Sequence, residues 1–130
     1  MNTTKITLGG KEYPLAMNLG LIMKIEAKGE TLSTMLDKIA DLNVTETVWM
    51  LSNMMVAAKE LDNYRRGKGL EPVCEEDFEP LTEEDLMNEF SYVNFMEEMF
   101  TNLQIAMTTL LKPTVEAKPS KKGKAAPQGE

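Results

Sequence analysis

The stretch KITLGGKEYPL, residues 5–15, indicates a β-hairpin at the start of a chain whose remaining pattern is mostly helical. Gly9-Gly10 can supply the positive φ angles of a two-residue turn. Such a turn places Leu8 opposite Lys11 and separates the side chains into two faces. The predicted apolar face holds Ile6, Leu8, Tyr13 and Leu15, and the predicted solvent-facing side holds Lys5, Thr7, Glu12 and Pro14.

An isolated two-stranded hairpin is only marginally stable in water. The hairpin predicted for residues 1–16 must therefore pack on the following helices or pair with a strand of another chain. Pro14 lacks an N–H group to donate, which favours an edge position. We expect the apolar face to cover a helical core. The edge at residues 5–7, or the outer face, could then meet a neighbouring subunit.

Residues 18–111 have the apolar periodicity of helices joined by short loops. Asn18 can cap the first helix, and Thr82 with Asp85 resembles a capping box. The predicted helices cover 19–28, 31 or 33 to 41, 45–66, 83–89 and 92–111, with an acidic loop over 70–81. The predicted fold class is therefore mainly α, with an N-terminal β-hairpin packed on a bundle of four to five helices in one domain, 1–111.

The two longest predicted helices have apolar faces that are wider than a solvent-exposed helix needs. In helix 45–66, two neighbouring stripes run along the helix. In helix 92–111, a second stripe of Phe95, Met99 and Ala106 lies beside the main one. The main stripe holds Val93, Met96, Phe100, Leu103, Met107 and Leu110.

The composition changes at Lys112. Residues 112–130 hold three of the six prolines and only one large apolar residue, Val115. This composition predicts a flexible, disordered tail. The net charge changes from −10 over residues 1–111 to +3 over residues 112–130.

The whole chain has 130 residues, a net charge of −7, eleven methionines, one cysteine and no histidine. The acidic balance argues against nucleic acid as a partner, because phosphate binding needs a basic surface. The lone Cys74 excludes an internal disulfide and favours a reducing compartment. No apolar run approaches the roughly 20 residues that span a bilayer, and the N-terminus lacks the apolar segment of a signal peptide. We expect a soluble intracellular protein.

The residue types do not favour catalysis, a metal or a cofactor. Without histidine, Cys74 has no base partner, and the acids around it should raise its pKa. The acidic stretch from Glu71 to Asp85 lacks the ligand spacing of an EF-hand. Gly9-Gly10 precedes no helix and no GK[ST] sequence, so it is not a phosphate-binding loop. We expect a protein that is not an enzyme.

Two features suggest protein contacts, and each has a structural alternative. Arg65, Arg66 and Lys68 either interact with the C-terminal end of their helix or dock an acidic segment such as the loop 70–81. The methionines either fill the core or form an adaptable binding surface. The candidate partner-binding residues are Met50, Met54, Leu61, Arg65, Arg66, Phe95, Met99 and Met107.

The order of the segments resembles a known family over residues 4–111. The hairpin ITLGGKEYPL leads into LGLIMKIEAKGETLSTMLDKI, a long helix, the helix start LTEEDL, a final helix and a loose tail. This order resembles the tail assembly chaperones of long-tailed bacteriophages (siphoviruses) and related prophages. The stretch NYRRGKGLEPVCEEDFEP departs from the compact versions of that family and leaves the connection of the third and fourth helices open.

The resemblance implies a non-enzymatic chaperone that binds the tape measure protein in the bacterial cytoplasm and is absent from the mature virion. It also implies a longer, frameshifted form that recruits tail tube protein, and Lys121-Lys122-Gly123 is a candidate position for the slippage. Self-association is a further expectation. The alternative is a structural tail-completion or head–tail accessory protein. A third class is a small regulator that acts by protein contact.

Overall fold

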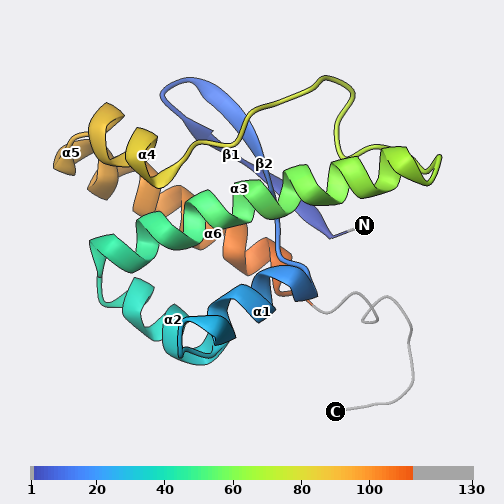
Figure 1. Ribbon diagram of the computed structural model, residues 1–130. Coiled ribbons are helices and arrows are strands. Elements are labelled where there is room, and N and C mark those ends of the chain that lie inside the picture. The colour runs from blue at the N-terminus through green and yellow to red at the C-terminus, as the bar shows by residue number, and fades with distance from the viewer. Residues whose placement is uncertain (1, 113–130) are drawn as a thin grey trace, which may run out of the picture.

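In the computed structural model, which describes residues 2–112, the chain opens with an antiparallel hairpin of β1 (Thr3–Leu8) and β2 (Lys11–Ala16) (Figure 1). The predicted register is confirmed: Leu8 lies opposite Lys11, and Ile6 lies opposite Tyr13. The turn residues Gly9 and Gly10 have φ angles of 59° and 80°. These angles belong to the left-handed region, which glycine adopts without steric cost.

Apart from connecting loops, the longest of which lies between α3 and α4, the rest of the described chain is helical, as the sequence predicted. Asn18 caps the first helix and accepts the Leu21 N–H at 3.0 Å. Asn43 caps the long third helix, which therefore begins slightly earlier than the expected start at Thr45. The helices are α1 (Leu19–Ala27), α2 (Leu32–Ala40), α3 (Val44–Gly67), α4 (Glu83–Glu89), α5 (Tyr92–Asn94), the π-helical η1 (Phe95–Met99) and α6 (Phe100–Leu110). The tail predicted to be disordered lies outside the described residues, apart from Lys112.

The hairpin packs on the helices of its own chain, which is the first of the two arrangements expected from its marginal stability. β2 lies against α3, and β1 lies against α6 (Figure 1). Two side-chain hydrogen bonds hold β1 to α6. Asn102 Nδ2 donates to the Thr7 carbonyl at 3.0 Å, and Asn2 Nδ2 donates to the Leu110 carbonyl at 2.7 Å. The predicted apolar face is buried: Ile6, Leu8, Tyr13 and Leu15 all belong to the core.

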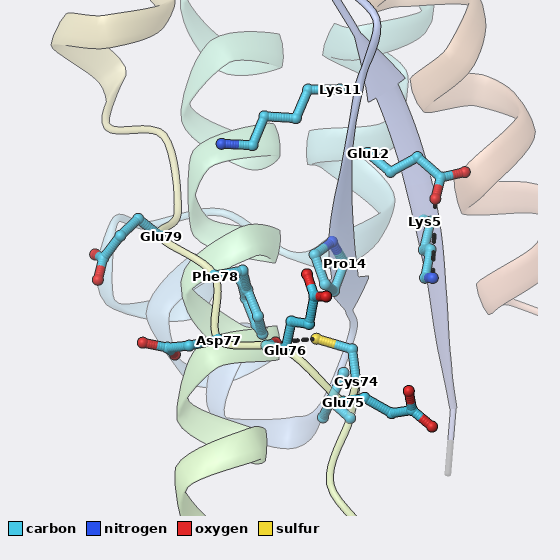
Figure 2. A pocket seen from close by; sticks show the side chains of 11 residues that line it. Lys5, Lys11, Glu12, Pro14, Cys74, Glu75, Glu76, Asp77, Phe78 and Glu79 are labelled. Atoms are coloured by element: carbon cyan, nitrogen blue, oxygen red, sulfur yellow. Dashed lines mark hydrogen bonds and ion pairs between the residues drawn. The ribbon is translucent and has the colours of Figure 1, made fainter.

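One residue of the face predicted to be solvated is buried. Pro14 should have faced water with Lys5 and Glu12, but its side chain is enclosed. It lines a groove together with Cys74 and Phe78 of the loop between α3 and α4 (Figure 2). The loop therefore covers part of the outer face of the hairpin, which the periodicity of the hairpin alone could not indicate.

The last predicted helix is continuous in sequence but contains a π-helical turn. The Phe100 N–H donates to the Phe95 carbonyl, which is the i→i+5 bond of a π-helix. Consequently Phe95 and Met99 of the second predicted stripe enter the core, whereas Val93 of the main predicted stripe is 59% exposed. Buried residues spaced by four drift by about 40° per step around an α-helix. The wider π turn reduces this drift and keeps Phe95, Met99 and Leu103 on the buried side.

Candidate functional site

The predicted partner-binding surface is mostly a core. Hairpin strand β2 and helices α1, α2 and α4 all contact α3, so its wide apolar face is already covered. The π turn in the last helix brings a further set of aromatic and thioether side chains inward. These five candidates are buried and are not available to a partner in this conformation: Met50, Met54, Phe95, Met99 and Met107. The interpretation of the methionines as core residues holds for the four methionines among these five.

The other candidates, Leu61, Arg65 and Arg66, lie near the C-terminal end of α3, where they are partly buried or exposed. Both arginines hold the loop that follows α3. Arg65 Nε donates to the Glu71 carbonyl, and an Arg66 amino group donates to the Cys74 carbonyl at 2.8 Å. The acidic loop does dock on these arginines, but through backbone carbonyls.

Asp62, which sequence reasoning missed, organises this docking. Its side chain is 1% exposed and accepts hydrogen bonds from Arg66 Nε at 2.8 Å and from the Val73 N–H at 2.9 Å. Burial alone would raise the pKa of Asp62, but the bonds from Arg66 and Val73 outweigh it, and the pKa lies below its ordinary value. The signal in the sequence was an acid four residues before an arginine on a helix.

Lys59 fixes the far end of the loop. Its ammonium group pairs with Asp77, donates to the Phe78 carbonyl at 2.9 Å and lies 5.1 Å from the centre of the Phe78 ring. The hydrogen bond with Asp77 raises the pKa of Lys59 and lowers the pKa of Asp77. The loop is thus attached to α3 at both Asp62 and Lys59, which lie three residues apart on that helix.

A groove with a volume of about 780 Å³ separates this loop from the outer face of the hairpin. We call it the loop–hairpin groove. Figure 2 shows its two walls, with strand residues on one side and the loop on the other. Its lining residues are Lys5, Lys11, Glu12, Pro14, Val73, Cys74, Glu75, Glu76, Asp77, Phe78 and Glu79. The lining is rich in carboxylates, with an apolar floor at Pro14 and Phe78.

Cys74 lies in the wall of the groove as an ordinary thiol. Its Sγ donates to the Glu76 carbonyl at 3.0 Å. Burial, and secondarily the charge of Asp62, raises the pKa of Cys74. The direction agrees with the expectation from the acidic surroundings, although burial is the larger cause. A thiol with a raised pKa is a poor nucleophile at neutral pH.

The exposed apolar side chains lie elsewhere. Met87 of α4 and Tyr92 and Val93 of α5 are 64%, 65% and 59% exposed, and they fall within seven residues of chain. We call these three residues the α4–α5 corner; Figure 1 places both elements at the same end of the molecule. Among the described residues, the other exposed large apolar side chains are Leu19, Met23, Leu42, Val44, Tyr64, Leu70, Ile105 and Leu111.

Residues 2–112 contain no grouping of three or more His, Cys, Asp or Glu side chains that could hold a metal ion. Among the described helices, none combines the length and the hydrophobicity needed to cross a membrane. Comparisons with protein-family models, with curated proteins and with solved structures found no match to this chain.

Proposed function

We propose that this chain is a non-enzymatic tail assembly chaperone of a long-tailed bacteriophage or prophage. It binds the tape measure protein, a long apolar helical client, while tail tube subunits assemble around that client. The family resemblance over residues 4–111 supports the proposal, as does the order of a hairpin followed by helices. The observation that carries it is that eleven large apolar side chains within the described residues remain exposed outside the core.

The α4–α5 corner is the surface that we assign to the client. Isolated exposed apolar residues are normal on proteins, but these three lie within seven residues of chain, on two elements at the same end of the molecule. The buried Phe95 ring supports this patch, since it stacks against Tyr92 with 6.1 Å between ring centres. A helical client could bury Met87 and Val93 against its own apolar stripe.

The remaining parts of the proposal follow the family. The chaperone works in the bacterial cytoplasm and is absent from the mature virion. A longer form, made by frameshifting near Lys121-Lys122-Gly123, recruits tail tube protein. Self-association along a long client would use several copies of the chain side by side.

The first experiment is to co-express the chain with the long coiled-coil-rich protein encoded next to it. Co-purification of several copies per client, measured by light scattering, would support the chaperone. The variant Met87→Gln/Tyr92→Gln/Val93→Gln should lose the client, whereas the matched variant Leu19→Gln/Met23→Gln on α1 should keep it. Circular dichroism checks that both variants remain folded.

If wild-type protein and client do not associate, the chaperone proposal fails. Detection of the chain in purified particles by mass spectrometry would then indicate a structural tail-completion or head–tail accessory protein. Co-purification that survives the α4–α5 corner variant would leave the chaperone in place and refute only the assigned surface.

A further inference from the structure

We propose that the loop–hairpin groove binds the basic segment 118–124 of the same chain, KPSKKGK. This inference goes beyond the proposed function and does not depend on it. It concerns a site that the client does not occupy, because the groove lies between the hairpin and the loop and does not include the α4–α5 corner.

The charge of the groove calls for a cationic occupant. Five carboxylates and two ammonium groups line it. Two of the carboxylates are already paired: Glu12 Oε1 lies 3.9 Å from Lys5 Nζ, and Asp77 pairs with Lys59. Within the part of the chain that the structure describes, Glu75, Glu76 and Glu79 form no ion pair. These three carboxylates lie on the loop wall, which Lys59 and Asp62 hold in place.

The segment 118–124 has the complementary charge. It contains four lysines and no acid, whereas residues 1–111 carry a net charge of −10. Its other residues, one glycine, one serine and one proline, have short side chains, so the backbone can approach the groove closely. Lysine stems can also cover the apolar floor at Pro14 and Phe78 while their ammonium groups reach the carboxylates.

The segment also begins close enough to reach the groove. Leu110, near the end of α6, is hydrogen-bonded to Asn2, and Asn2 lies three residues before Lys5 in β1. Three residues of strand span about 10 Å. The six residue-to-residue steps from Lys112 to Lys118 can span about 20 Å when extended. This length is sufficient to pass the edge of β1 and enter the groove at Lys5.

The covalent link makes weak contacts effective. Each exposed ion pair contributes little by itself, but a short flexible link gives an effective concentration on the order of millimolar. The segment of the same molecule therefore occupies the groove in preference to that of a second copy in dilute solution. Because the contacts are largely electrostatic and exposed, salt should release the segment.

Paramagnetic NMR on the full chain tests the proposal. A nitroxide is attached at position 120 in the Cys74→Ser/Ser120→Cys protein. We expect the amide signals of Glu12 and of residues 75–79 to lose intensity in dilute protein. The intensity should return in about 1 M salt, where the Debye length is about 3 Å. The amides of α2, far from the groove, serve as an internal reference.

Charge variants make the test specific to the groove. Glu75→Gln/Glu76→Gln/Glu79→Gln should abolish the signal loss. The matched variant Glu26→Gln/Asp37→Asn/Asp41→Asn, which changes the same charge on exposed positions elsewhere, should retain it. If the groove variant does not fold, Lys118→Gln/Lys121→Gln/Lys122→Gln/Lys124→Gln tests the same contact without altering the folded domain, and a reduced signal loss supports the proposal.

Three results would overturn the inference. The first is an unchanged amide signal intensity at residues 75–79 in the protein that carries the nitroxide at position 120 and has no charge substitution in the groove. The second is a signal loss that the groove variant does not reduce. The third is an equally strong loss for isotope-labelled, nitroxide-free protein that is mixed with spin-labelled protein, because that result assigns the groove to the segment of a second copy.

Discussion

Replacing Asp62 with asparagine should destabilise the domain, because Asp62 holds the loop to α3. The carboxylate is buried and accepts two hydrogen bonds, at 2.8 Å from Arg66 Nε and at 2.9 Å from the Val73 N–H. Asparagine has nearly the same shape and can keep one acceptor for Val73. The side-chain NH2 group of the asparagine would then face Arg66 Nε, and both groups are hydrogen-bond donors. We therefore expect the loss of one charge-assisted hydrogen bond.

The expected magnitude is about 1.5–3 kcal/mol of unfolding free energy, the range for hydrogen bonds to charged groups. For a domain of about this size, the loss corresponds to a decrease in Tm of roughly 6–12 °C. Urea denaturation followed by circular dichroism measures the free energy, and an unchanged m-value confirms that the transition itself is the same. Asp77→Asn is the control, because the side chain of Asp77 is largely exposed; its effect should be clearly smaller.

The pH dependence gives a second, independent readout. The folded-state pKa of Asp62 is lower than its ordinary value of 3.8. The stabilisation by the charged carboxylate is therefore fully present above about pH 4 and is lost as the pH falls through the folded pKa. The stability difference between wild type and Asp62→Asn should shrink on acidification below that pH. Equal effects of Asp62→Asn and Asp77→Asn, or a difference that grows on acidification, would refute the reasoning.

Three further predictions concern other parts of the domain. Met54→Ala should cost about 2–5 kcal/mol because it opens a cavity in the core, whereas Met87→Ala at an exposed position should stay within about 0.5 kcal/mol; comparable losses in urea denaturation would contradict the assignment of Met54 to the core. Thr82→Ala should cost about 1 kcal/mol by removing the side chain that accepts the Asp85 N–H, and Thr82→Ser should restore most of the Tm. Cys74 should react with iodoacetamide more slowly at pH 7 than a cysteine peptide does, because its pKa is raised; a native rate equal to the rate in urea would exclude this protection.

The hairpin and the helix starts were predictable because local chemistry determines them. Gly9-Gly10 fixes the turn, and alternation then fixes the register of all six pairs. Asn18 and Thr82 cap helices with the side chains that the sequence shows. Each of these features depends on residues within a few positions of one another, so no knowledge of the tertiary structure is needed.

The set of apolar side chains that remains exposed was not predictable, since it depends on what covers each apolar face. The periodicity of residues 45–66 showed correctly that the face of α3 is wide, but not that β2, α1, α2 and α4 share it. The π turn at Phe95–Met99 changed which side chains of the last helix face inward. Likewise, Asp62 became important only through Val73, eleven residues later in a loop.

The pairing of the first strand with the last helix has a consequence for synthesis of the protein. The hydrogen bonds of Asn2 with Leu110 and of Asn102 with Thr7 join residues 108 and 95 positions apart. The ribosome makes β1 first, yet the helix that covers it is the last of the described helices. Contacts of such long range carry a loop-closure entropy cost and slow folding. Nascent chains that stop before α6 keep β1 uncovered, so truncated translation products of this domain should aggregate, whereas chains that include α6 can cover β1.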